Sequence, residues 1–266
     1  MKRRLLAIAL LVSTGVAAQQ PPVLPIRLHR GYLVVVKCSV GGLRDLTAIV
    51  DTGATETFVD GSVVARLGLA TRPDTATLVA KQIPVRAVDL AEVVFGPVKV
   101  ARVAGLAMDL RLVEREFGVR ADVVLGMDVL SRSSFTIDYR DKVIRFGVPG
   151  RMKYSAPLRS MAPLLLVEAR VSGRQAVLQV DTGVDGLVMY SGSKPSQTGE
   201  LKLAMSVLPT VLEEGRTLEV GDWKAYQVQV VRVQATDLGF DGLLGLKAVG
   251  ARRLGLDFER GTIFWE

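Results

Sequence analysis

The triplet Asp-Thr-Gly occurs twice in this chain of 266 residues, at positions 51–53 and again at 181–183. Each copy directly follows an apolar run, Ala48-Ile49-Val50 before the first and Val177-Leu178-Gln179-Val180 before the second. A short apolar run that ends at a glycine turn is typical of a buried strand. The repeat therefore favours a chain of two similar halves, each with a buried strand that ends at an aspartate.

Further segments match between the two halves. Val100–Val103 resembles Val230–Val233 at an offset of 130 residues, the same offset that relates the two triplets. Further along, the offset is 119, so the second half lacks 11 residues. We expect the missing part to be Arg111–Arg120, which has the spacing of a short amphipathic helix. The blocks at offset 119 are Val124-Leu125-Gly126 with Leu243-Leu244-Gly245, Ile137-Asp138-Tyr139 with Leu256-Asp257-Phe258, and Ile144-Arg145-Phe146 with Ile263-Phe264-Trp265.

Composition favours an all-β protein. The residues are 49% hydrophobic and 23% charged, a composition typical of globular proteins. Valine-rich runs are broken by glycine and proline, which favours strands joined by turns. We expect only short helices, and a closing hairpin in each half. The expected helices are Val63–Leu69, with its stop at Gly68, then Arg111–Arg120, Met127–Arg132 and Leu246–Arg253; the hairpins are Phe135–Phe146 and Leu254–Trp265.

The N-terminus has the features of a signal peptide. Lys2-Arg3-Arg4 precedes the apolar stretch Leu5–Val12, which is too short to span a bilayer, and Val16-Ala17-Ala18 offers small residues for cleavage before Gln19. An uncleaved anchor is the alternative. We therefore predict a periplasmic or secreted protein. The expected organisation is a signal peptide at 1–18, an extension at 19–30, a first lobe at 31–148, a linker at 149–163 and a second lobe at 164–266.

Several kinds of chemistry are disfavoured by composition. The only cysteine, Cys38, lies in an apolar run and reads as a buried thiol, and the only histidine, His29, lies near the expected mature N-terminus. Nucleophilic catalysis needs a histidine held beside the nucleophile, and a structural zinc site needs several Cys or His ligands. One cysteine and one histidine near the terminus do not meet either need. The net charge of +7 permits loose association with an anionic cell envelope, but the basic residues are too scattered to favour nucleic acid. We expect no metal and no cofactor.

The two aspartates, Asp51 and Asp181, are the candidate reactive groups. Glycine at Gly53 and Gly183 would allow a sharp turn at the end of each strand, and Thr52 and Thr182 could hydrogen-bond across to the opposite loop. Two carboxyl groups in contact share one proton, because both cannot ionise cheaply. One can then take a proton from a water while the other donates to a carbonyl oxygen, which would cleave a peptide bond without a covalent intermediate.

These motifs resemble the retropepsin-like aspartic proteases, and specifically exported bacterial members with two such lobes in one polypeptide. The resemblance covers nearly all of the expected mature chain. It rests on Asp51-Thr52-Gly53-Ala54-Thr55, Val123–Leu130, Thr136–Tyr139, Asp181-Thr182-Gly183 and Asp241–Gly245. It implies two all-β lobes forming a pseudo-twofold, single-chain dimer. It also implies catalytic roles for Asp51 and Asp181, supporting roles for Thr52, Gly53, Ala54, Thr182 and Gly183, and structural roles for Gly126 and Gly245.

The chain departs from the family pattern after the second triplet. Val184 stands where members usually carry Ala, Ser or Thr, and we expect it to crowd the floor of the cleft. Asp185 is either a substrate-binding residue or a turn residue, and its counterpart in the first half, Thr55, is also a possible substrate contact.

The expected flaps also depart from the family pattern, because they are poor in glycine. Thr77–Val88, with Gln82 and Ile83 as possible substrate contacts, contains no glycine, and Met205–Leu218 contains only Gly215.

The sequence thus predicts a monomeric aspartic endopeptidase that acts on peptides or proteins. Two alternatives stay open. One is a retropepsin-like module that has lost hydrolysis and binds a peptide or an envelope ligand. The other is a pair of independent lobes, each of which pairs with another chain.

Overall fold

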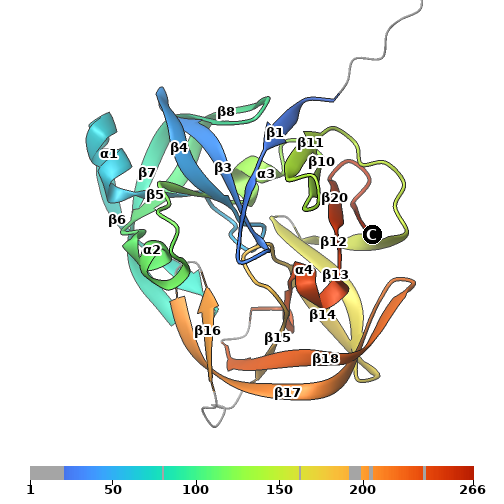
Figure 1. Cartoon of the computed structure of the whole chain (residues 1–266). Coiled ribbons are helices and arrows are strands. Elements are labelled where there is room, and N and C mark those ends of the chain that lie inside the picture. The colour runs from blue at the N-terminus through green and yellow to red at the C-terminus, as the bar shows by residue number, and fades with distance from the viewer. Residues whose placement is uncertain (1–20, 80, 162, 192–198, 204–205, 236–237) are drawn as a thin grey trace, which may run out of the picture.

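The computed structural model describes residues 21–79, 81–161, 163–191, 199–203, 206–235 and 238–266. The protein is all-β with short helices, as predicted, and its strands form two sheets (Figure 1). The predicted signal peptide, residues 1–18, lies outside the described residues. No described helix is both long enough and apolar enough to cross a membrane.

The first sheet has eight strands in the order β2-β3-β4-β9-β5-β8-β7-β6. Most of its strands are antiparallel, but β4 runs parallel to β9 and β5 runs parallel to β8. Its strands are β2 (Arg27–His29), β3 (Leu33–Val40), β4 (Leu43–Val50), β5 (Phe58–Asp60), β6 (Thr71–Leu78), β7 (Lys81–Phe95), β8 (Val98–Met108) and β9 (Val123–Leu125).

The second sheet has thirteen strands in the order β1-β11-β10-β20-β21-β12-β13-β14-β19-β15-β18-β17-β16. The strands are β1 (Val23–Pro25), β10 (Phe135–Asp138), β11 (Val143–Phe146), β12 (Tyr154–Met161), β13 (Leu164–Val171), β14 (Arg174–Val180), β15 (Leu187–Ser191), β16 (Gly199–Leu203), β17 (Ser206–Val220), β18 (Trp223–Gln234), β19 (Gly242–Leu244), β20 (Arg253–Asp257) and β21 (Thr262–Trp265).

One strand order occurs in both sheets. The run β3-β4-β9-β5-β8-β7-β6 of the first sheet has the same connectivity as β13-β14-β19-β15-β18-β17-β16 of the second. Even the extra pairing is matched, because β3 contacts β7 and β13 contacts β17. The strand that precedes each Asp-Thr-Gly triplet therefore has the same neighbours in both halves.

The described residues form four short helices that overlap the predicted ones: α1 (Gly61–Leu67), α2 (Arg111–Phe117), α3 (Met127–Leu130) and α4 (Leu246–Val249). Helix α4 is shorter than expected, because it ends at Val249 and Arg253 already begins β20. Helix α1 begins where the Asp60 carboxylate accepts a hydrogen bond from the Ser62 N–H, and it ends at Gly68. Gly68 has φ 63°, a left-handed conformation that suits glycine and stops the helix as predicted.

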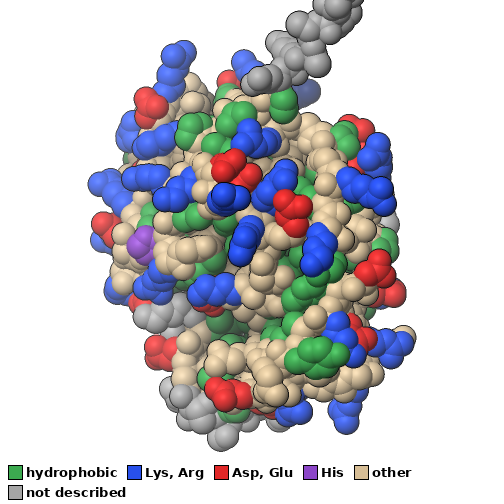
Figure 2. All heavy atoms as spheres, turned by 45° about the vertical axis from the view of Figure 1, so that its right-hand side comes forward, with side chains coloured by type: hydrophobic (Ala, Val, Ile, Leu, Met, Phe, Trp, Pro, Cys, Tyr) green, Lys and Arg blue, Asp and Glu red, His purple; other side chains and the backbone are tan. Residues whose placement is uncertain are grey.

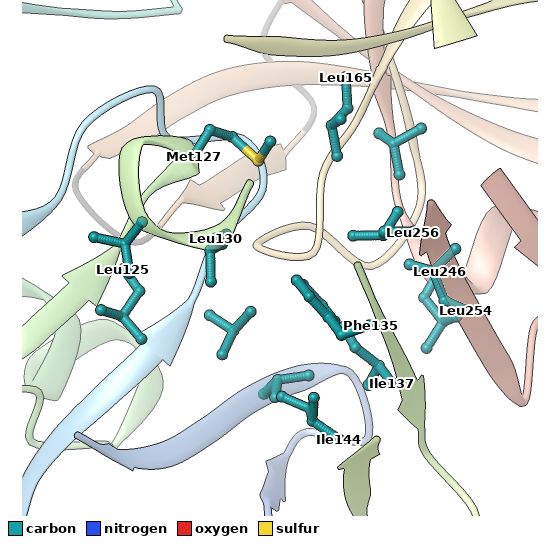
Figure 3. Packing of buried hydrophobic residues seen from close by; sticks show 14 of the residues in the cluster. Leu125, Met127, Leu130, Phe135, Ile137, Ile144, Leu165, Leu246, Leu254 and Leu256 are labelled. Atoms are coloured by element: carbon teal, nitrogen blue, oxygen red, sulfur yellow. The ribbon is translucent and has the colours of Figure 1, made fainter. Parts of the chain in front are cut away.

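The two halves are joined by a shared part of the second sheet. The hairpin β10–β11 of the first half lies beside the hairpin β20–β21 of the second, with Phe135 opposite Leu256. One hydrophobic core continues beneath both hairpins. Figure 3 shows this core with Leu125, Met127, Leu130, Phe135, Ile137 and Ile144 from the first half and Leu165, Leu246, Leu254 and Leu256 from the second.

Two segments expected to lie outside the lobes are built into the sheets. Strand β12 falls within the expected linker, 149–163, and pairs with both β21 and β13. Its alternation is hard to see in the sequence because its buried member is the small Ala156, between the exposed Ser155 and Pro157. Strands β1 and β2 likewise fall within the expected extension, 19–30, and pair with β11 and β3.

Candidate active site

The aspartates Asp51 and Asp181 occupy equivalent places, each just past the end of a buried strand. In the first half, Val50 pairs with Leu125 in the parallel ladder of β4 and β9, and the Asp51 N–H donates to the Leu125 carbonyl at 3.1 Å. In the second half the same relation holds between β14 and β19, and the Asp181 N–H donates to the Leu244 carbonyl at 3.0 Å. The apolar-apolar-Gly segments thus fix where each aspartate leaves its strand.

Reciprocal hydrogen bonds tie the two triplets together. The Thr52 hydroxyl donates to the Val180 carbonyl at 2.8 Å and accepts from the Thr182 N–H at 3.0 Å. The Thr182 hydroxyl donates to the Val50 carbonyl at 2.8 Å and accepts from the Thr52 N–H at 3.1 Å. Both threonines are fully buried, so these four bonds satisfy groups that water cannot reach.

Glycine is required beside the carboxyl groups because the opposite loop approaches so closely. A Cβ atom on Gly53 would lie 2.5 Å from Cγ of Asp181, and one on Gly183 would lie 3.1 Å from Oδ1 of Asp51. The glycine N–H groups also hold the aspartates in place. Gly53 donates to Oδ1 of Asp51 at 2.9 Å, and Gly183 donates to Oδ1 of Asp181 at 2.6 Å.

The two carboxyl groups are buried and hydrogen-bonded to each other, and only 7% of Asp51 and 6% of Asp181 is exposed. Burial raises the pKa of both groups, because it penalises the charged form. The negative charge of Asp51 raises the pKa of Asp181 further, well above its usual range. Two carboxyl groups in such contact can share one proton, because the charge of one disfavours ionisation of the other.

A cleft of about 430 Å³ opens above the pair. Among the residues singled out from the sequence, Gly53, Ala54, Thr55 and Gly183 line it with the two aspartates. Gln82 and Ile83 do not. They lie on β7, which is flanked by β6 and β8, whereas β6 is the edge strand of its sheet and faces the cleft. The hairpin residues that line the cleft are Thr75, Ala76, Thr77, Leu78 and Val79.

The residues after the second triplet do not line the cleft. Val184 is buried in a small apolar cluster with Val188, Leu208, Val233 and Leu243, and is not part of the cleft lining. Asp185 forms an ion pair at 3.0 Å with Lys247 of α4, and half of its side chain is exposed. Val184 was expected to crowd the floor of the cleft, but it is not among the residues that line it.

The first flap is the hairpin β6–β7, and it reaches across to the second half. Its strands pair up to Leu78 and Lys81, and Val79 in the turn packs against the apolar cluster that contains Val184 and Tyr190. The corresponding hairpin of the second half is β16–β17, whose turn at residues 204–205 lies outside the described residues. Gly215 lies within strand β17, next to a register shift, rather than in the turn.

Three features of the site were missed by sequence reasoning. Gln179 is buried in β14, and its amide donates to the Gly53 carbonyl at 3.1 Å, across the two halves. Tyr190 and Phe240, whose ring centroids lie 5.6 Å apart, line the cleft. The sequence did hold a signal for Gln179, because it is a polar residue in an otherwise apolar strand. The first half has Ile49 at the corresponding position.

The third missed feature is the contact between Asp128 and Thr57. Asp128 accepts from the Thr57 hydroxyl at 2.7 Å and from its N–H at 3.0 Å, which fastens the first active-site loop to α3. In the second half, Leu187 and Lys247 occupy the corresponding positions. The two loops are therefore fastened to their helices by different contacts.

No group of three or more His, Cys, Asp or Glu side chains in the described part of the chain is arranged to hold a metal ion. Cys38 is buried as expected, and burial raises the pKa of its thiol to about 12.

The family comparison relates part of the chain to known proteins. A family model described as aspartyl protease matches residues 36–129. This stretch runs from β3 into α3, so it contains Asp51, the first flap and Gly126, while Asp181 lies beyond it. A comparison with curated proteins found no match. The family match indicates a protease-like module in the first half of the chain.

Proposed function

We propose that this protein is an aspartic endopeptidase that hydrolyses peptide bonds with a water held between Asp51 and Asp181. The observation that carries the proposal is the pair itself: two buried, hydrogen-bonded carboxyl groups at the base of a cleft. Two such groups sharing a proton can supply a general base and a general acid at once. The matching strand order around the two triplets supports an origin of the site by internal duplication.

In the proposed reaction, Asp181 holds the shared proton and Asp51 carries the charge. The charged form of Asp51 is stabilised by the N–H groups of Gly53 and Ala54, whereas only the Gly183 N–H serves Asp181. Asp51 takes a proton from the water as it attacks the carbonyl carbon, and Asp181 donates its proton to the carbonyl oxygen. Collapse of the tetrahedral intermediate then breaks the C–N bond: Asp51 returns its proton to the leaving nitrogen, and Asp181 takes back a proton from a hydroxyl of the intermediate as the new carboxyl group forms.

A peptide-binding module without hydrolysis is the rival. The first flap favours it, because its cleft-lining residues 75–79 include no glycine and Pro84 on its second strand has no N–H to donate. Against it, a glycine N–H donates to each aspartate, both aspartates line the cleft, and Val184 is not part of the cleft lining. The peptidase is therefore the function that we favour.

We also propose that the protein is exported, that it matures by cleavage before Gln19 and that it acts as a monomer in the periplasm or outside the cell. The basic start and short apolar stretch of residues 2–12 support export. The core shared between the halves supports a single chain as the functional unit. The basic residues on the face shown in Figure 2 are spread among acidic ones, which supports at most a loose association with an anionic envelope.

The test is cleavage of a mixed peptide library by the protein that begins at Gln19, between about pH 3 and 8. We expect cleavage by the wild type and none by Asp51→Asn. Asp45→Asn is the matched control, because Asp45 is an exposed carboxylate of the same strand, β4. A folded wild-type protein that cleaves nothing at any pH would refute the peptidase and favour the binding module.

A further inference from the structure

The two sides of the cleft differ in chemistry. The side formed by the second half is apolar and contains Tyr190, Leu238, Phe240 and Leu243. Tyr190 and Phe240 pack together there as a tilted aromatic pair. The side formed by the first half is mixed: it has apolar members such as Phe58 and Leu78, and it carries the polar side chains of Thr55, Glu56, Thr75 and Thr77. A peptide lying across the cleft therefore meets a largely apolar surface on one side and, on the other, a mixed surface that carries the Glu56 carboxylate.

The charges in the cleft all have the same sign. Asp51, Asp181 and Glu56 line it, and none of the described residues that line it is Lys or Arg, although the chain carries 34 basic and 27 acidic residues. The cleft is therefore negative in a protein whose net charge is +7. Such a local reversal attracts cationic groups and repels anionic ones.

Glu56 is the charge that a substrate side chain could pair with. It is exposed at the edge of the cleft, and no cation of the described residues forms an ion pair with it. Burial raises the pKa of Glu56, and the negative charges of its neighbours Asp128 and Asp74 raise it further. Asp128 is already held by Thr57, and Asp74 accepts from the Thr75 N–H. No described residue forms an ion pair with Glu56, Asp74 or Asp128, although the charges of Arg72 and Arg132 reach Asp74 and Asp128.

We propose that the cleft selects peptides with a Lys or Arg side chain on the Glu56 side of the scissile bond and a large apolar side chain on the opposite side. This inference rests on the proposed peptidase function and names its substrate class. Glu56 is five residues from Asp51, so their Cα atoms are at most roughly 18 Å apart. An extended peptide advances about 3.3 Å per residue, so the basic residue lies within about five positions of the cleaved bond.

The expected preference is moderate. An exposed ion pair changes a binding constant by roughly two- to fivefold, and dissolved salt weakens this effect by screening the charges. We therefore expect kcat/KM for a peptide with Lys at the selected position to exceed that of the Gln peptide by about two- to fivefold at low salt. The Glu peptide should be cleaved more slowly than the Gln peptide, and the difference should shrink as salt is added.

The experiment scans one cleaved peptide with Lys, Gln and Glu at each position on both sides of the scissile bond. The wild type is compared with Glu56→Gln and with the matched control Glu114→Gln, an exposed glutamate of α2 that is not part of the cleft lining. For the wild type, kcat/KM of the Lys peptide should exceed that of the Gln peptide at one position. Glu56→Gln should bring the two values together, and Glu114→Gln should leave the difference unchanged. Phe240→Ala should selectively slow peptides with a large apolar residue on the other side.

The outcomes separate this inference from the proposed function. Cleavage with equal rates for Lys, Gln and Glu peptides at every position would overturn the selectivity and leave the peptidase intact. If no peptide is cleaved, the proposed peptidase function is refuted. The selectivity is then tested by measuring how tightly Asp51→Asn binds fluorescently labelled forms of the same peptides. Tighter binding of the Lys peptide that is lost in the double variant with Glu56→Gln supports the inference, and equal binding of all three refutes it.

Discussion

The hydroxyl of Thr52 is expected to stabilise the whole protein, because its two bonds join the halves directly above their shared core. Replacing Thr52 with Val keeps the shape of the side chain but removes the hydroxyl. The Val180 carbonyl and the Thr182 N–H, which it contacts at 2.8 and 3.0 Å, then lose their buried partner. An unpaired buried backbone group costs about 1–3 kcal/mol, so we expect a loss of about 2–6 kcal/mol.

Thr52→Ser is the matched variant. Serine keeps both hydrogen bonds and loses one buried methyl group, which costs about 1 kcal/mol. Thr52→Val is therefore expected to be the less stable variant although it is the more apolar. Because the free energy of unfolding of a typical domain is only about 5–15 kcal/mol, a loss at the upper end would leave little folded protein.

The assay is urea unfolding of the three proteins followed by circular dichroism, with the free energy extrapolated to water. Peptide cleavage is measured in parallel, and Thr52→Val should also lose activity because the loop that carries Asp51 is no longer fastened. A Thr52→Val protein that is as stable as Thr52→Ser would refute the reasoning, since it would mean that the bonds between the halves contribute nothing.

Three further outcomes are expected. Because the pKa of Asp181 is raised, the folded state keeps a proton that the unfolded carboxyl, with a pKa of 3.8, has lost. The free energy of unfolding therefore falls as pH rises above 3.8. Asp181→Asn should flatten this pH dependence in urea titrations from pH 4 to 8. Lys247→Ala should lower the free energy of urea unfolding by less than about 1 kcal/mol, because its ion pair with Asp185 is half-exposed, and a larger loss would contradict this assignment. Cys38 should react with an aromatic disulfide at pH 8 only after urea unfolds the protein, and rapid labelling of the folded protein would show that the thiol is not buried.

Local chemistry made much of the fold predictable. Each triplet follows an apolar run and ends in a glycine, and this pattern is sufficient to predict a buried strand that stops at a turn. The hairpins at 135–146 and 254–265 and the helix stop at Gly68 were predictable for the same reason, because each depends on a few neighbouring residues.

Contacts between distant segments were harder to predict. Strand β12 was missed because its buried residue, Ala156, gives only a weak apolar signal, and its stability comes from pairing with β21 at the far end of the chain. The flap residues that face the cleft were misassigned. Alternation shows which residues share a face of a hairpin, but not that β6 is the edge strand nearest to the aspartates.

Part of the candidate site was open to prediction. Two triplets at one offset suggest that their aspartates meet. However, the contact of the buried Gln179 with Gly53 follows from the packing of strand β14 against a loop of the other half, 126 residues away in the chain. The chemistry of the cleft sides depends in the same way on Tyr190 and Phe240, which are distant from Glu56 in the chain.

The most direct test of the central claim is the pH dependence of kcat/KM for one good peptide, measured with the wild type, Asp51→Asn and Asp181→Asn. A shared proton predicts a bell-shaped profile for the wild type, because activity needs one carboxyl charged and the other protonated. Both variants should be folded and inactive at every pH. Cleavage that persists in either folded variant with an unchanged profile would contradict the claim that Asp51 and Asp181 act as one catalytic pair.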